Sequence, residues 1–280
     1  MTRHIKIWQR LLIWQLQQEN KLDLEKPVSY YLRGLVTNDS IFDNITIKEL
    51  ASHRSGLPRI PANYDKVEGY EMMQPYRMYK RENLYQYLSS LKKMKQGNYD
   101  YSNLGFGLLG TFAEIVCEKS LEELFIKYIF SPLEMNDSYL TNKRTSADSA
   151  TGFFYGKPAD YWIFDCLAGC GGVKTNANDM LIYLDAHLNT LNSKFSQAVG
   201  RITEPVDSVQ QNMKICYGWH TLEDLQHRVY WHNGGTYGFS TFAAFDPVEK
   251  TSLILASNSF QVNTSLDKLG HDLLLILTRK

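Results

Sequence analysis

Tyr101 and Asn103 lie two residues apart, after a turn at Gly97 and before an apolar stretch that begins near Gly105. A phenol can exchange a proton and a carboxamide can hold a substrate amide, so at a junction between loop and helix both side chains could face one cleft. The same residues also suit a structural role, with the tyrosine ring packed and Ser102 or Asn103 capping the helix. Local sequence alone favours the structural role.

A second candidate group is formed by His232, Asn233 and Gly234, which lie between two β-rich runs. Glycine lets a backbone edge approach a ligand closely, and its amide can donate to a carboxylate or to a developing oxyanion. A tight hairpin turn with a histidine on the surface explains residues 232–235 equally well. Both interpretations stay open on these residues alone.

Two other stretches carry weaker signals for chemistry. The glycine-rich run 169–175 lacks the spacing of a phosphate-binding loop, so it does not predict nucleotide binding. Ser55 lies in residues 53–58, which are typical of a helix end with Gly56 as the C-cap and Pro58 beyond it. We therefore do not expect Ser55 to be a nucleophile.

The cysteines show no spacing typical of a metal site or of a disulfide framework, so we expect buried or half-buried thiols and no metal. Their number leaves the redox compartment undecided. They are Cys117, Cys166, Cys170 and Cys216.

Composition excludes several classes of protein. The chain has 280 residues, 44% apolar and 21% charged, which excludes a disordered or collagen-like chain. Thirty basic residues balance thirty acidic ones, so no global field favours nucleic acid. The longest apolar runs, such as 273–277, are far shorter than the roughly 20 residues that span a bilayer. We expect a soluble globular protein without a nucleic-acid partner or a transmembrane segment.

The N-terminal segment has a basic start and a partly apolar stretch at 7–16. Gln9, Arg10 and Gln15 interrupt that stretch, and no small-residue cleavage site follows. The spacing predicts an amphipathic helix over residues 5–19 and no export signal, and localisation stays undetermined.

Two capping boxes mark helix starts, because in each a hydroxyl and a carboxylate satisfy backbone amides reciprocally. One box begins at Thr46 and the other at Ser120. Between them, residues 107–117 are rich in Leu, Phe and Ala and predict a buried helix. A further helix is predicted to start after Thr175 or Asn176.

Beyond residue 214 the apolar period changes from helical to two, which predicts strands over 228–231, 239–245 and 251–257. A closing helix follows, with one apolar stripe formed by Leu266, Leu269, Leu273 and Ile276. Helices, then an antiparallel sheet, then a covering helix indicate an α/β (α+β) fold. We expect an antiparallel sheet flanked by helices, plus a helical lobe.

Seven motifs in order resemble the serine beta-lactamase and penicillin-binding-protein superfamily, in its class C-like and esterase-like branch. The resemblance covers roughly residues 11–280, and each motif alone is weak. They are residues 21–28, 45–58, 101–105, 132–135, 171–175, 232–235 and 245–247.

The resemblance implies one beta-lactamase-like domain over residues 1–280. Its helical lobe would lie at roughly 45–150 and its sheet lobe at roughly 150–280, with the helix 5–19 at their interface. The usual N-terminal strands of the family would be lacking, which would leave one edge of the sheet without a neighbour.

The resemblance also implies a mechanism built on three motifs. A Ser-x-x-Lys supplies the nucleophile and a lysine, a Tyr-x-Asn supplies a proton-shuttling phenol and an amide, and a Lys/His-x-Gly strand forms the opposite wall. The serine would be acylated by an ester, an amide or a D-amino-acid peptide as the leaving group departs. Water would then hydrolyse the acyl-enzyme and restore the serine, without metal or cofactor.

Carried over by position, Tyr101 is the general base or acid and Asn103 the ligand of the substrate amide. His232, Asn233 and Gly234 match the third motif. Histidine in place of lysine there favours the esterase or peptidase members. The expected partner is a small-molecule or peptide substrate, and the oligomeric state is left open.

The first motif departs from the family pattern. By its distance from Lys21, the family's lysine falls on Lys6 and its serine on Arg3, and no serine precedes Ser29. Arginine is always protonated at neutral pH and cannot act as a nucleophile. A shifted alignment would put the serine just before Met1. We expect an impaired hydrolase; the alternatives are a non-catalytic ligand-binding pseudoenzyme or a truncated gene product.

Overall fold

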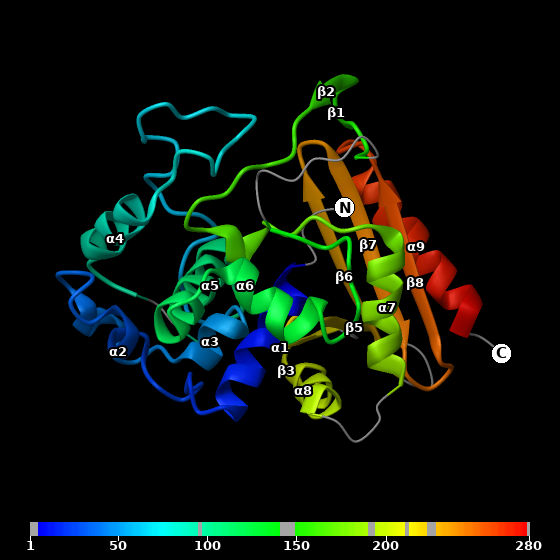
Figure 1. Ribbon diagram of the computed structural model, residues 1–280, viewed down its shortest axis with the longest axis horizontal. Coiled ribbons are helices and arrows are strands. Elements are labelled where there is room, and N and C mark those ends of the chain that lie inside the picture. The colour runs from blue at the N-terminus through cyan, green and yellow to red at the C-terminus, as the bar shows by residue number, and fades with distance from the viewer. Residues whose placement is uncertain are drawn as a thin grey trace.

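The computed structural model describes residues 5–94, 97–140, 149–189, 194–210, 213–222 and 228–278. A helical lobe lies on one side and a sheet covered by two helices on the other, with helix α1 between them (Figure 1). The helices and helical turns are α1 (Ile5–Gln18), α2 (Val28–Leu32), η1 (Asp39–Phe42), α3 (Ile47–Ala51), α4 (Arg81–Ser90), α5 (Asn103–Cys117), α6 (Leu121–Phe125), η2 (Ile126–Phe130), η3 (Ala168–Cys170), α7 (Ala177–Leu188), α8 (Lys194–Ile202) and α9 (Asn263–Thr278).

The main sheet is antiparallel throughout, in the order β3-β4-β5-β6-β7-β8, and β1 pairs with β2 in a separate hairpin. The predicted fold class is confirmed. The strands are β1 (Gly152–Phe154), β2 (Lys157–Ala159), β3 (Pro205–Gln210), β4 (Met213–Cys216), β5 (His220–Leu222), β6 (Val229–Thr236), β7 (Phe239–Asp246) and β8 (Thr251–Ser257).

Strand β6 is longer than the sequence predicted. It continues through His232 and Gly234 to Thr236, and the turn to β7 is made by Tyr237 and Gly238. The interpretation of residues 232–235 as a hairpin turn is therefore wrong, because they pair with residues 240–243 of β7. The candidate group lies on a strand.

Helix α1 occupies the predicted range but is not amphipathic in its first turns. Its apolar side chains from Ile7 to Ile13 are buried, and so are Gln9 and Arg10, each 2% exposed or less. The reason is position: α1 packs against α5 of the helical lobe and against α8 beside the sheet. Residues 6–13 of α1 are therefore covered on all sides, whereas Gln18 at the end of the helix is exposed.

The predicted caps are confirmed where the signal is local. Thr46 and Ser120 form capping boxes at α3 and α6, and Asn176 caps α7. The end of α3 differs, because the helix stops at Ala51 and the left-handed residue after it is His53, with φ of 57°. Gly56 is not the C-cap.

The predicted stripe of α9 is wrong in part. Leu269 is 48% and Ile276 is 70% exposed, whereas Leu274 is fully buried. The helix turns Gly270 towards the sheet, where a Cβ atom would lie 2.4 Å from the ring of Phe242. This close approach sets the rotation of α9.

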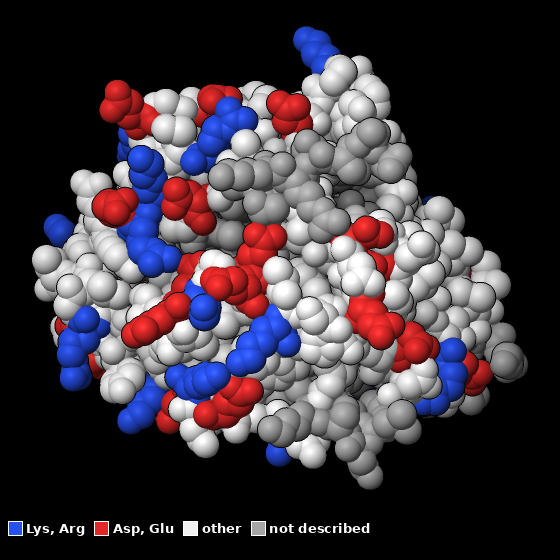
Figure 2. Space-filling model, viewed as in Figure 1, with Lys and Arg blue, Asp and Glu red and all other residues white. Residues whose placement is uncertain are grey.

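The distribution of surface charge and the burial of the cysteines agree with the expectations from the sequence. Figure 2 shows basic and acidic side chains interspersed over the face in view. Cys166, Cys170 and Cys216 are buried and Cys117 is half-buried, and no disulfide joins these four described residues. None of the helices within the described ranges is long and apolar enough to cross a membrane.

Candidate active site

Lys6, on the first turn of α1, is buried at the centre of the candidate site. Its Nζ donates to Asn103 Oδ1 at 2.9 Å and to the backbone oxygen of Cys170 at 3.2 Å. It also lies 4.7 Å from the centre of the Tyr101 ring. The structure thus brings Lys6, Tyr101 and Asn103 together, although Lys6 and Asn103 are 97 residues apart. Arg3 lies outside the described residues.

The local backbone around Tyr101 is fixed by the start of α5. Ser102 is the N-cap: its Oγ accepts from the Gly105 amide at 2.9 Å and donates to the Pro58 oxygen at 2.7 Å. This confirms the structural role for Ser102. Asn103 is the first residue of α5 and is 2% exposed, so its amide points inward to Lys6. Ser102 therefore caps the helix, while Asn103 faces the candidate site.

His53 holds the ring of Tyr101. The two rings stack with centroids 4.5 Å apart, and His53 Nδ1 accepts from the Ser102 amide at 3.0 Å. Burial, together with the charges of Arg10 and Lys6, lowers the pKa of His53 well below its ordinary value. His53 is therefore uncharged at neutral pH, and it supports the Tyr101 ring by stacking against it. Its positive φ is a backbone strain of the kind that clusters at functional sites.

Arg10, one turn after Lys6 on α1, is a second buried cation. Its Nη1 donates to the Cys216 oxygen at 2.8 Å, and its guanidinium lies 4.5 Å from the Phe106 ring. Burial lowers its pKa to about 9, so it stays charged at neutral pH. Arg59, which is exposed, lies with its guanidinium carbon 5.0 Å from the Tyr101 ring. The site is electropositive.

The residues expected to form the opposite wall lie on β6, which pairs with β5. His232 is 2% exposed, and its ring lies 6.1 Å from that of His220. Gly234 is buried on the same strand and its oxygen accepts from Thr241 Oγ1 at 3.3 Å. Tyr99 links this strand pair to His53, because its ring meets that of His53 edge-on at 5.9 Å and its hydroxyl lies 3.5 Å from His220 Nε2.

Asn233 requires a correction. Its side chain donates to Asp267 Oδ2 of α9 at 2.6 Å, because neighbouring residues of a strand point to opposite faces. Its side chain therefore belongs to the contact between the sheet and α9 and not to the substrate wall. Only the backbone of Asn233 stays with that wall.

Two buried histidines predict loss of stability in acid. Burial lowers the pKa of His187 and that of His220 to about 4. Between pH 6.5 and 4 the unfolded chain binds more protons than the folded one, so the free energy of unfolding falls as pH falls. We expect up to about 3 kcal/mol per histidine. Urea unfolding at pH 7.5 and 4.5 measures this difference in the free energy of unfolding. A smaller difference between the two pH values in His187→Asn than in the parent supports the prediction. An unchanged pH effect contradicts it.

Gly169 predicts a second effect on stability. A Cβ atom there would lie 2.6 Å from the Phe106 backbone oxygen and from Gln9 Oε1. Gly169→Ala must therefore move η3, whose Cys170 oxygen accepts from Lys6. We expect a loss of about 1–3 kcal/mol in urea unfolding.

Gly200→Ala is the matched control, because a Cβ at that position on α8 meets nothing within 4 Å. It should leave stability unchanged or raise it by less than about 1 kcal/mol. Equal unfolding midpoints for the two variants would contradict the close packing around η3.

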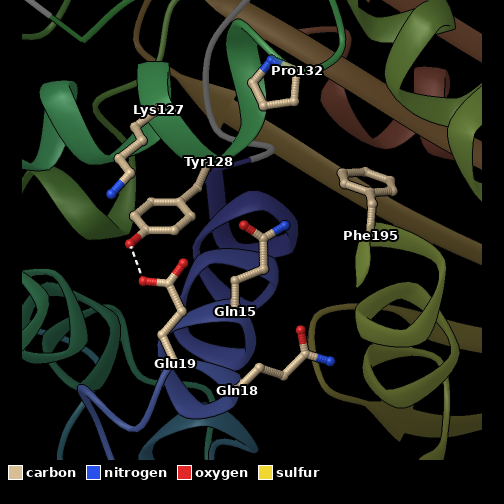
Figure 3. Close-up of a pocket in the computed structure, with 7 residues that line it drawn as sticks. All are labelled: Gln15, Gln18, Glu19, Lys127, Tyr128, Pro132 and Phe195. Atoms are coloured by element: carbon tan, nitrogen blue, oxygen red, sulfur yellow. Dashed lines mark hydrogen bonds between the residues drawn. The ribbon is translucent and has the colours of Figure 1, made fainter. Parts of the chain in front are cut away.

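A separate pocket lies at the other end of α1 (Figure 3). Its volume is about 200 Å³ and Tyr128 donates to Glu19 across it at 2.6 Å. Gln15 is nine residues after Lys6, about 14 Å along a helix. None of the predicted site residues lines it. The lining residues are Gln15, Gln18, Glu19, Lys127, Tyr128, Pro132 and Phe195.

The sequence did not single out His53, Arg10, Arg59 or His220 as site residues. The stretch after His53 looked like an ordinary helix end, and Arg10 looked like the polar face of a helix. No group of three His, Cys, Asp or Glu side chains in the described ranges is placed to hold a metal ion.

Comparisons with known proteins show the family and the fold of this chain. The Beta-lactamase family model matches residues 10–278. A beta-lactamase of Providencia stuartii is 26% identical, covering 87% of this chain and 69% of its own, and the unguisins hydrolase ungD' of Aspergillus campestris is 24% identical, covering 83% and 46%. A class C beta lactamase structure from Rhodobacter sphaeroides superposes with a TM-score of 0.78 at 21% identity, over 98% of this chain and 85% of that one. The chain is thus clearly shorter than these curated relatives.

Proposed function

Since this chain belongs to the beta-lactamase family, with a hydrolase fold and a serine hydrolase-like function, we propose that the site around Lys6 binds an acyl compound. The compound is an ester, an amide or a D-amino-acid peptide. The contact of Lys6 Nζ with both Asn103 Oδ1 and the Tyr101 ring carries the proposal. It unites a cation, a phenol and an amide in one buried place.

The proposed roles follow from the contacts. Lys6 and Arg59 lie against the ring of Tyr101, and positive charge there stabilises a phenolate, so the phenol can take a proton from a nucleophile and return it to a leaving group. Asn103, bound to Lys6, holds the substrate amide. The β6 backbone near His232 and Gly234 offers donors to the developing oxyanion.

In this chain we propose that acyl transfer is impaired, because Arg3 stands where the resemblance puts the nucleophile. A site that keeps its charges and donors but lacks the nucleophile typically retains a small part of its rate enhancement. The test is hydrolysis of p-nitrophenyl acetate and of a chromogenic cephalosporin, with labelling by a fluorophosphonate. We expect weak turnover of at least one substrate, lost in Tyr101→Phe and kept in the control Tyr30→Phe. Full turnover in Tyr101→Phe would refute the role of Tyr101.

A second candidate function is non-catalytic binding of an anionic acyl ligand. The buried cation Arg10 favours it, because within the described part of the chain its Nε and Nη2 have no hydrogen-bond partner and could donate to a carboxylate. A thermal shift with acylated peptides that carry a carboxylate, and an unmodified mass after incubation, would support binding over catalysis. No shift together with turnover would exclude it.

A further inference from the structure

One edge of the buried Arg10 guanidinium has no hydrogen-bond partner. The side chain is 2% exposed, and its Nη1 donates to the Cys216 backbone oxygen at 2.8 Å. Within the described part of the chain, Nε and Nη2 have no partner. These two nitrogens lie on the same edge of the planar group, so their N–H groups can bind one anion together. Arg10 therefore offers a preformed pair of donors in the interior.

The charge of Arg10 also lacks a counter-ion. None of the ion pairs among the described residues includes it. Buried charges are usually paired, because an opposite charge offsets the cost of removing an ion from water. The side chains whose charges act on Arg10 are three tyrosines and a cysteine, and none is a carboxylate: Tyr99, Tyr101, Tyr217 and Cys216.

Arg10 lines a small cavity between α1, α3 and α8. The volume of the cavity is about 10 Å³, on the scale of one water-sized particle. Most of its walls are buried apolar side chains. The lining residues are Arg10, Ile13, Trp14, Leu24, Ala51, Arg201, Ile202 and Tyr217.

This lining suits an anion better than a water molecule. A buried water needs acceptors for its own hydrogens as well as donors, whereas a halide ion needs donors only. The lining has two arginines and, among the described residues, no carboxylate. The second arginine, Arg201, is exposed, and its guanidinium carbon lies 5.9 Å from the Trp14 ring. Both charged side chains at the cavity are therefore positive.

The Phe106 ring connects Arg10 to the candidate active site. The Arg10 guanidinium lies 4.5 Å from the centre of this ring, Lys6 Nζ lies 5.6 Å from it, and the His53 ring lies 4.7 Å from it. Burial and then the charge of Arg10 lower the pKa of His53. An anion on Arg10 would offset this charge directly behind the site.

We propose that Arg10 binds a halide ion such as chloride at the cavity between α1, α3 and α8. Nε and Nη2 donate to the ion, and the apolar walls exclude water from it. The inference does not rest on the proposed function, because it requires no acyl substrate. An acyl carboxylate that reached the same two N–H groups would have to displace the ion.

The test is chloride-35 NMR of the unmodified chain in sodium chloride solution, in which exchange with a bound ion broadens the chloride line. We expect the excess line width of the parent to fall at least about fivefold in Arg10→Met, which keeps an apolar side chain but removes the donors. Arg33→Met is the matched control, because Arg33 is an exposed arginine at the end of α2. It should retain the line width of the parent.

A second variant and a crystal keep the test decisive if Arg10→Met does not fold. Ala51→Val keeps Arg10 but fills the cavity, and it should lose the excess line width too. Crystals of the parent grown in sodium bromide should show an anomalous peak beside Arg10 Nε and Nη2.

An unchanged line width in both variants, or bromide crystals without a peak at Arg10, overturns the inference. Neither result affects the proposed hydrolysis, which Tyr101→Phe tests separately.

Discussion

Arg3→Ser is expected to raise the hydrolysis of p-nitrophenyl acetate by at least about a thousandfold over the parent chain. The change places a hydroxyl three residues before Lys6, in the Ser-x-x-Lys spacing of the family that the chain resembles. The rest of the proposed apparatus is already assembled, because Lys6 contacts Asn103 and the Tyr101 ring. Only the first covalent step would be supplied.

Arg3→Ala is the control for this gain. It removes the same charge without adding a hydroxyl, so its rate should stay near that of the parent. A gain of the same size in Arg3→Ala would show that the arginine blocks the site and that no serine is needed. No gain in Arg3→Ser would contradict the position assigned to the nucleophile.

The second large effect concerns Lys6. In the Arg3→Ser background, Lys6→Met should lower the rate by at least about a hundredfold, because the phenol and the new hydroxyl lose the cation that stabilises their deprotonated forms. Stability should fall only modestly, by about 1–3 kcal/mol. Methionine fills a similar volume, but it leaves the buried oxygens of Asn103 and Cys170 without the donor that Lys6 provides.

The pair of readouts separates catalysis from folding. Initial rates of hydrolysis measure the effect of Lys6→Met on catalysis, and the urea midpoint measures its effect on stability. An equal rate with and without Lys6 would remove it from the mechanism. A large drop of the urea midpoint would show that Lys6 serves mainly to hold α1 to α5, through Asn103.

Local signals in the sequence predicted the capped helices and strands β7 and β8. The boxes at Thr46 and Ser120 need only residues three apart, and the period-two runs needed only their own side chains. Strands β3 to β5 were not predicted, because they are short and carry polar residues at inward positions, such as His220 and Thr221. Their strand conformation depends on pairing with neighbouring strands of the sheet, which their own residues do not reveal.

The site was only partly predictable. Tyr101, Asn103 and Lys6 came from motif order, since nothing local indicates that residues 6 and 103 touch. His53 was missed because its role depends on a left-handed backbone that histidine adopts rarely. Asn233 was misplaced because residues 232–235 looked like a turn; on a strand, alternation assigns it to the α9 face.

Intact-mass spectrometry with peptide mapping, after exposure to a fluorophosphonate, tests most directly whether Lys6, Tyr101 and Asn103 form an acyl-transfer site. The account predicts an unmodified parent chain, one adduct on Arg3→Ser located at position 3, and slow labelling when Tyr101→Phe is added. An adduct elsewhere in the chain, or an Arg3→Ser variant that stays unmodified while folded, would contradict it.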